Sequence, residues 1–592
     1  MLGWASNKAE RAVGTGVFRA LGAVLVAVVV VALLFPREPN LAYDRTWVWV
    51  GFVAWGTAWL VAVVAWRRFG RSRVVRWVAR RSGVVAWALT GLGMAAALVV
   101  ALNLGYRFGW DARVLVDLGS RLDQGAGGTG TGAGTGTGGT VPDYYYRYLS
   151  RYPNQVPFAA LTKTSFQLGR ALGWQETTVF AVLNAVCVGV TLQSVFVVVR
   201  RVRGALAALA AQVAGLALLA VSPWVAVPYT DVVTLPVPIA ATALLLVAAT
   251  RPSRVAAVTL GVVAVAVLSF GYVVKTTPVA TVAGLLALGV LVLLSRLRDR
   301  RRAATAALVL LVSTGAFLGL SSGLRVALSD STGLDLARVD TSLTPPLSWW
   351  LAMGLTRRAP SGLPRYGAYD PTMVTAIASM DGPQIDRYSR ETLDHRLGAL
   401  GPGGYAQFAA DKVAWNLGDG MFWAWGEGLD GASVVPRHGP LTAWVVSWDH
   451  PAGDHYGVRA GLTQGLWLVV LLAAGAGLLV RPYRRDVALL VVSAVGIIVF
   501  TLVLQGRSRY LFVYAPVFIA LAGAVVPVGR PAVPWHRSFH FLRSGAYAPR
   551  VEGGGDVRAR TEPVRGSGGD RRLQGPWRSA PGGRGRGAVR AP

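Results

Sequence analysis

The sequence predicts an all-α polytopic membrane protein with about twelve transmembrane helices. Hydrophobic residues make up 53% of the 592 residues and charged residues 15%, and the hydrophobic residues occur in long runs. A run of about 18 or more apolar residues can cross the bilayer as a helix, which satisfies its own backbone hydrogen bonds in lipid. The twelve predicted spans are 17–35, 47–66, 83–102, 178–199, 205–223, 233–249, 256–274, 278–295, 304–323, 461–480, 486–505 and 511–528.

The placement of arginine supports twelve spans. The short loops after the second, fourth, sixth, eighth and tenth spans are basic, and cytoplasmic loops are typically enriched in arginine. With twelve spans, all five loops and both termini fall on one side. The arginines are Arg67, Arg68, Arg71, Arg73, Arg76, Arg80, Arg81, Arg200, Arg201, Arg203, Arg251, Arg254, Arg296, Arg298, Arg300, Arg301, Arg302, Arg481, Arg484 and Arg485. We therefore expect a multi-pass protein of the cytoplasmic (inner) cell membrane with both termini cytoplasmic.

The composition restricts which partners and which kinds of binding site we expect. The net charge of +30 comes largely from the basic loops and from the tail after Pro527. These segments are expected to face anionic membrane lipids, so nucleic acid is not expected as a partner. Cys187 is the only cysteine, which excludes an intramolecular disulfide and a cysteine-based metal site. The first span is too long for a signal peptide and lacks a cleavage site, so we expect it to remain as an anchor.

The spans divide the chain into five parts. In order, they are an N-terminal two-span hairpin with a basic cytoplasmic loop (1–82), a membrane core whose first outside loop is 103–177 (83–323), an extracytoplasmic segment (324–460), the last three spans (461–528) and a basic cytoplasmic tail (529–592). We expect disorder in the tail and in the Gly/Thr tract 125–140, because neither can bury enough apolar surface. Residues 156–174 are predicted to form an amphipathic helix on the outer surface, and the segment 324–460 to be partly helical.

Several short motifs occur in a characteristic order on the predicted outer side. They are an acid, Asp111, after the third span; Tyr152-Pro153-Asn154; Pro228-Tyr-Thr-Asp231; Lys275-Thr-Thr-Pro278; Pro346 to Leu355; Gly403-Gly404-Tyr405 with Lys412; Gly418-Asp419-Gly420; and Arg507-Ser-Arg509-Tyr510. In this order, residues 83–528 resemble the GT-C superfamily of polytopic glycosyltransferases, in the bacterial group that is protein O-mannosyltransferase-like or aminoarabinose-transferase-like.

The resemblance implies a GT-C-like fold and a transferase activity. Such enzymes move a hexosyl or pentosyl group from a polyprenyl-phosphate carrier, which here implies an acceptor in the cell envelope: a glycan, a lipid or a protein. The reaction would take place on the outer face of the cytoplasmic membrane. The family acid lies in the first outside loop of the core, so the first two spans of this chain would be an addition to that core.

By this resemblance, the candidate catalytic residues are Asp111 and Asp231. A carboxylate near the acceptor can remove a proton from its hydroxyl or orient it. Asp111 could instead cap a helix from Ala112 to about Leu122, and Asp117 is a weaker candidate because it is expected on a solvated helical face. Asp231 lies at the membrane edge, where an acid is costly without a role or partner; it could instead cap the span that opens at Val232.

Basic and aromatic residues complete the predicted site. Lys275, Arg507 and Arg509 are candidates to bind the donor phosphate, which suits an arginine fork. They could instead be snorkelling side chains at helix ends. Tyr152 and Asn154 are candidates for the substrate entrance, although a structural turn or the interfacial aromatic belt explains them as well.

Metal and nucleotide sites have little support in the sequence. His438, His450 and His455 lack the spacing of a zinc site, and neither a Walker A loop nor a Rossmann glycine pattern occurs on the predicted cytoplasmic side. The sequence indicates no certain cofactor, and a divalent metal stays an open alternative.

The rival function is a multi-span transporter or flippase of a lipid-linked or envelope substrate. Transporters typically carry internal repeats and mid-membrane polar residues. The spans here contain almost no ionisable residues at their centres, and the acids and the few basic residues outside the cytoplasmic loops gather at the predicted outer side. A scaffold that has lost activity is a third alternative.

Overall fold

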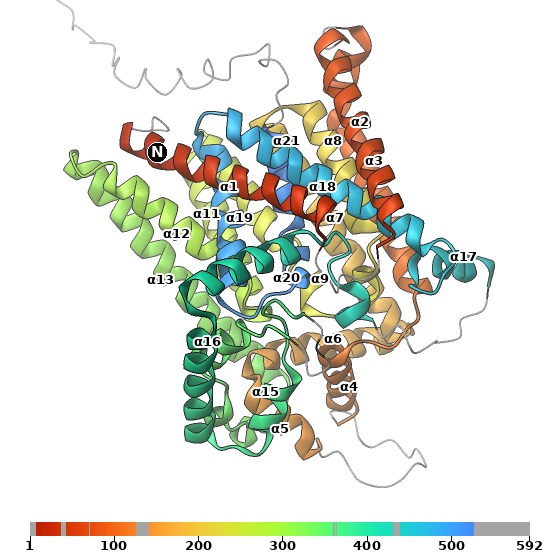
Figure 1. The fold of residues 1–592 in the computed structure, drawn as a ribbon, viewed down its shortest axis with the longest axis vertical. Helices are drawn as coiled ribbons and strands as arrows, with labels where there is room; N and C mark the ends of the chain where they lie inside the picture. Colours follow the sequence, from red (N-terminus) through yellow and green to blue (C-terminus); the bar gives the residue numbers. More distant parts are fainter. Residues whose placement is uncertain are drawn as a thin grey trace, which may run out of the picture. The chain divides into compact units, whose positions relative to one another are not determined.

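Long apolar helices dominate the structure (Figure 1). The computed structural model describes residues 8–36, 43–69, 72–125, 141–358, 362, 364–429 and 439–525. Most of the Gly/Thr tract, the tail and His438 lie outside these ranges. Within them, nine helices are long and apolar enough to cross a membrane, and three apolar helices are shorter. Together they coincide with the twelve predicted spans, which confirms the all-α polytopic membrane fold.

The twelve spans have the following bounds. They are α1 (Lys8–Leu34), α2 (Arg45–Phe69), α3 (Arg73–Asn103), α7 (Glu176–Val202), α8 with the π-turn η2 (Ala205–Gly215 and Leu216–Ala220), α9 with α10 (Thr230–Val233 and Val237–Thr250), α11 (Arg254–Val274), α12 (Val279–Leu294), α13 (Arg300–Ser331), α18 (Tyr456–Val480), α19 (Arg485–Val503) and α21 (Ala515–Val525).

Further helices lie in the two large segments between spans. They are α4 (Trp110–Gly125), α5 (Asp143–Arg151), η1 (Pro153–Gln155), α6 (Val156–Leu172), η4 (Leu336–Arg338), η5 (Thr341–Leu343), α14 (Leu347–Met353), α15 (Pro371–Ala376), η6 (Ile377–Ser379), α16 (Gly382–Leu417, kinked at Gly401), η7 (Ala424–Gly428) and α17 (Pro440–Asp449). Two short helices, η3 (Pro223–Ala226) and α20 (Ser508–Phe512), lie in the loops before α9 and α21. The predicted helix at 156–174 is therefore present as α6. Among the described residues, β-structure is limited to two isolated bridges.

Two spans are interrupted where the sequence predicted a continuous helix. Pro236 caps α10 and Pro238 stands in its first turn, where the missing N–H of proline does no harm. The chain therefore turns between α9 and α10, and Asp231 lies in the short helix α9. The last span is likewise divided into α20 and α21, which leaves the Arg507–Arg509 segment outside the long apolar helix.

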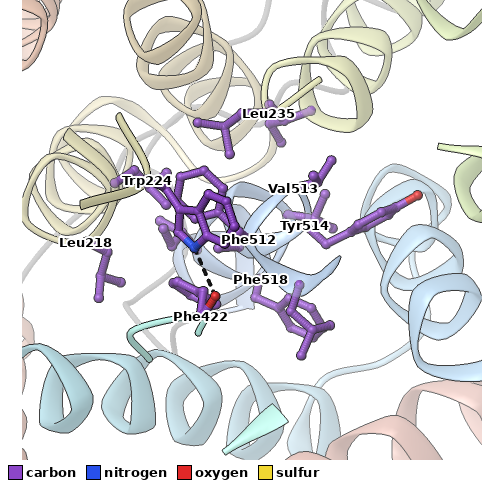
Figure 2. Packing of buried hydrophobic residues seen from close by; sticks show 14 of the residues in the cluster. Leu218, Trp224, Leu235, Phe422, Phe512, Val513, Tyr514 and Phe518 are labelled. Atoms are coloured by element: carbon purple, nitrogen blue, oxygen red, sulfur yellow. Dashed lines mark hydrogen bonds between the residues drawn. The ribbon is translucent and has the colours of Figure 1, made fainter. Parts of the chain in front are cut away.

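Aromatic side chains from distant segments form the centre of the core (Figure 2). Trp224 stacks on Phe512 with ring centres 5.9 Å apart, and its indole N–H donates a 2.9 Å hydrogen bond to the Phe422 carbonyl oxygen. Phe422 packs in turn against Phe512 and Trp467. These contacts join η3, the loop after α16, α18 and α20, and hold the elements that carry the site.

The basic turns gather at one end of the helices. Three interactions link them: Arg484 donates to the Val202 carbonyl oxygen, Arg201 to the Thr250 hydroxyl, and Arg485 forms an ion pair with Glu10. The ends of α7, α10 and α18 and the start of α1 therefore lie together. This is the arrangement that the arginine pattern requires. In Figure 1, α4, α5 and α15 lie at the bottom, away from the end of α2 and the start of α3 at the top.

Candidate functional site

Asp111 lies in the first turn of α4, with both carboxylate oxygens hydrogen-bonded to tyrosines. Oδ1 accepts a bond from the Tyr148 hydroxyl at 3.1 Å and Oδ2 from the Tyr229 hydroxyl at 3.0 Å. The alternative that Asp111 is the N-cap of a helix starting at Ala112 is wrong, because α4 already begins at Trp110. Its position in the first turn is still favourable for a negative charge.

Tyr229 connects Asp111 to a group of cations. Its hydroxyl donates to Asp111 and accepts a 3.1 Å bond from the Gln155 amide. The centre of its ring lies 5.7 Å from Lys275 Nζ and 5.6 Å from Arg509 Cζ, within the range of cation–π attraction. Tyr229 is therefore in contact with Asp111, the candidate base, and with Lys275 and Arg509, two candidates to bind the donor phosphate.

Asp231 is fully buried between those two cations. Lys275 Nζ lies 3.0 Å from Oδ1, and Arg509 Nε lies 4.0 Å from Oδ2. The capping alternative for Asp231 is wrong, since Tyr229 is the N-cap of α9. A buried carboxylate needs such partners, because its desolvation otherwise costs several kcal/mol.

Lys275 and Arg507 do not snorkel to water. Their exposed fractions are 8% and 5%, so the snorkelling alternative is wrong for both. Burial lowers the pKa of Lys275 to about 8, although the neighbouring Asp231 carboxylate acts in the opposite direction. Lys275 therefore carries its proton at neutral pH and can lose it in mildly alkaline solution.

A tyrosine from the last span fixes the turn that carries Lys275. The Tyr514 hydroxyl donates to the Thr277 carbonyl oxygen at 2.9 Å and accepts from the Thr281 N–H at 3.2 Å. Tyr514 is itself buried, as Figure 2 shows. The turn between α11 and α12 is thereby tied to the segment that also presents Arg507 and Arg509.

Arg507 lies between two aromatic rings. Its Cζ is 5.7 Å from the ring centre of Tyr369 and 5.8 Å from that of Trp423. Burial, and after it the nearby Arg509, lower the pKa of Arg507. Phe422 and Trp423 both have positive φ angles, 53° and 57°. Such backbone is costly for bulky residues and is found preferentially at functional sites.

Asp419 holds the segment between the two arginines. Its carboxylate accepts hydrogen bonds from Ser508 Oγ at 2.5 Å, from the backbone N–H groups of Met421 and Trp423 at 3.0 Å each, and from the Tyr43 hydroxyl. Ser508 stands between Arg507 and Arg509 in the chain, so this hydrogen bond holds the backbone segment that carries both arginines.

The comparisons with known proteins concern family and fold. Residues 9–529 match the model of a protein family described as conserved hypothetical integral membrane protein. The chain belongs to this family of integral membrane proteins. A comparison with curated proteins gives no match. Among solved structures, the crystal structure of ArnT from Cupriavidus metallidurans in the apo state is similar, with 15% identity over 76% of this chain and 78% of that chain and a TM-score of 0.26. A TM-score this low supports no conclusion about the activity of this chain.

The remaining predicted residues lie around this cluster or away from it. The Tyr152 ring packs on Tyr148 with ring centres 5.3 Å apart, beside Asp111. Asn154 is half-buried in the same turn, η1. Asp117 lies on an exposed helical face, where it pairs with Arg113 at 3.9 Å.

Two tyrosines and a glutamine of the site were not predicted from the sequence. Tyr229 and Tyr148 donate to Asp111, and Gln155 donates to Tyr229. The available signal was the position of Tyr229 two residues before Asp231, and of Gln155 directly after the Tyr-Pro-Asn motif.

The carboxylates of the site do not form a cation-binding set. Among the described residues, no group of three or more His, Cys, Asp or Glu side chains could hold a metal ion. Asp111 faces tyrosine hydroxyls and Asp231 faces cations. A hard divalent cation prefers several oxygen ligands together, so these two carboxylates do not fit one.

Proposed function

We propose that this protein is a glycosyltransferase that moves a sugar from a polyprenyl-phosphate carrier to a hydroxyl of an envelope glycan, lipid or protein. The observation that carries the proposal is the contact of Tyr229 with Asp111 on one side and with Lys275 and Arg509 on the other. This contact joins a carboxylate that can accept a proton to two cations that can bind a phosphate.

Asp111 is suited to act as the general base. Each of its oxygens accepts one tyrosine hydrogen bond, and an ionised carboxylate offers about four acceptor positions. The side chain is half-buried, so an acceptor hydroxyl can reach it. The hydroxyl oxygen attacks the anomeric carbon, its proton passes to Asp111, and the bond from that carbon to the phosphate oxygen breaks with its electron pair on the phosphate.

The charge around Asp231 matches the leaving group. Lys275, Arg507 and Arg509 supply three positive charges and Asp231 one negative charge, a net charge of 3 − 1 = +2. A phosphate monoester released by the reaction carries about −1.5 to −2 near neutral pH. Preorganised cations that meet a developing charge are typically the largest single contribution to catalysis.

This arrangement changes the role that we assign to Asp231. It is fully buried and both oxygens face Lys275 and Arg509, so it has no room for a substrate hydroxyl. We assign it as a positioning residue that keeps two like charges close together. Asp111 is then the catalytic carboxylate of the proposed reaction.

The test compares Asp111→Asn with Asp117→Asn. Both residues lie on α4 and both substitutions remove one negative charge, but Asp117 is 54% exposed and pairs with the exposed Arg113. In membranes supplied with a labelled polyprenyl-phosphate sugar, we expect Asp111→Asn to lower the transfer rate by about 10²–10⁴-fold, the usual contribution of a general base. Asp117→Asn should transfer at the rate of the unmodified protein. Equal rates in the two variants would contradict the proposal.

A further inference from the structure

Three arginines line a small pocket at the end of the bundle where the basic turns gather. The pocket has a volume of about 70 Å³ and lies between the turn after α7 and the turn from α18 to α19. Arg203 is the C-cap residue of α7, Arg481 that of α18, and Arg484 the N-cap residue of α19. The candidate glycosyl-transfer site uses none of them.

The rest of the pocket wall is apolar. It includes Phe18 from α1, Val487 from α19 and Val525 at the end of α21, all buried. On neighbouring turns of α1, Val13 and Val17 are 52% and 38% exposed. A cationic rim above an apolar wall at the ends of membrane helices suits a ligand with an anionic head and an apolar chain.

The three arginines of this pocket repel one another, and two acidic side chains compensate part of the positive charge in this region. Asp486 pairs with Arg484 at 2.5 Å, and Glu10 pairs with Arg485. Burial, and after it the charges of Arg481 and Arg484, lower the pKa of Arg203 to about 10. An anion between these side chains would relieve their mutual repulsion, and the planar guanidinium fork matches two oxygens of one phosphate.

We propose that this pocket binds the phosphate group of an anionic membrane phospholipid, with its acyl chains along the exposed apolar face of α1. Basic pockets between membrane helices are known to bind lipid head groups in this way. The apolar wall and the location at helix ends favour a lipid over free phosphate. A bound lipid would join α1 to α7, α18, α19 and α21, and so stabilise the attachment of the N-terminal helix.

The test is lipid binding by the full-length protein with Arg203→Gln and Arg481→Gln combined. The matched control combines Arg73→Gln and Arg76→Gln, which removes the same charge from two exposed positions of α3. Native mass spectrometry in detergent would titrate phosphatidylglycerol, phosphatidylcholine and inorganic phosphate. We expect the pocket variant to bind phosphatidylglycerol about tenfold more weakly, as the loss of a charge-assisted hydrogen bond implies, and the control to bind it normally.

Three results would overturn the proposal. They are equal binding by the pocket variant and the unmodified protein, equal weakening in the control, and binding of inorganic phosphate as tight as that of the lipid. All variants retain the basic tail, so any lipid binding by the tail is the same in each of them. If the glutamine variant fails to fold, Arg203→Lys with Arg481→Lys keeps the charge and removes the fork. This pair should bind the lipid measurably more weakly, and unchanged affinity would exclude a guanidinium–phosphate contact.

Discussion

At the scale of single residues, Lys275 makes the proposed reaction sensitive to pH. Its pKa is lowered from 10.5 to about 8 by burial. Below pH about 8, the ammonium can bind the donor phosphate, and as the pH rises through this value the charge is lost. We expect kcat/KM for the donor, which reports the ionisation of the free enzyme, to fall above pH about 8. In Lys275→Arg, whose charge persists, the fall should move to higher pH.

A stability measurement separates this effect from unfolding. The unfolded chain binds a proton at Lys275 up to about pH 10.5, and the folded chain only up to about pH 8. The unfolded state therefore binds more protons between these values, so Lys275 makes the folded state more stable as the pH rises through that window. Thermal unfolding in detergent should show no loss of stability from Lys275 where activity falls. The same alkaline fall in Lys275→Arg would assign the effect to another group.

The sequence indicated the charged residues of the site but not the contacts between them. Asp111 and Asp231 each stand near the start of a helix, where capping is the usual role of an aspartate. Their actual partners are far away in the chain: the Tyr229 hydroxyl that binds Asp111 is 118 residues distant. A single sequence does not reveal such a pairing, because it depends on how α4, α6 and α9 pack. The role of Asp111 as a base stays a prediction.

At the scale of elements, Lys412 ties α16 to two other segments. Its fully buried ammonium donates to the carbonyl oxygens of Gly354 at 2.7 Å, Leu502 at 3.0 Å and Leu504 at 2.7 Å. Lys412→Met has a similar shape and leaves these carbonyls without the lysine donor. We expect this substitution to lower the free energy of unfolding by about 3 kcal/mol, since a buried carbonyl left without its partner costs about 1–3 kcal/mol.

An exposed position of α16, in the part before the kink at Gly401, provides the control. Arg390 is 71% exposed and pairs with Asp386 one turn away, an interaction that contributes about 0.3–0.5 kcal/mol. Thermal unfolding in detergent should therefore show a clear loss of Tm for Lys412→Met and almost none for Arg390→Met. If the two variants unfold at the same temperature, Lys412 does not hold these segments together.

Hydropathy predicted where the membrane helices lie, but not where two of them are interrupted. The twelve apolar runs correspond to twelve helices, because a long apolar run has few alternatives in a bilayer. The turns between α9 and α10 and between α20 and α21 were not predicted, since apolar residues continue through both. Asp231 lies in α9 and Arg509 in α20, the short helices before these turns, and their side chains are 4.0 Å apart.

At the scale of the whole molecule, the two proposed sites lie at opposite ends of the spans. Arg481 follows the last residue of α18, whereas Gln464, on the third turn of α18, accepts a hydrogen bond from the N–H of Gly420, the residue after Asp419. A helix of 25 residues such as α18 is about 37 Å long, enough to cross the hydrocarbon core. If the arginine pocket faces the cytoplasm, Asp111 and the donor phosphate site face the outside.

Cysteine labelling can test this sidedness because the chain has one cysteine, Cys187, which is buried in α7. In a Cys187→Ala background, Asp117→Cys places a thiol on the exposed face of α4, and Arg73→Cys places one at the exposed start of α3. A maleimide that cannot cross membranes should label position 117 in intact cells and position 73 only after permeabilisation. Labelling at position 73 but not 117 in intact cells would invert the topology and place the proposed transfer reaction on the cytoplasmic side.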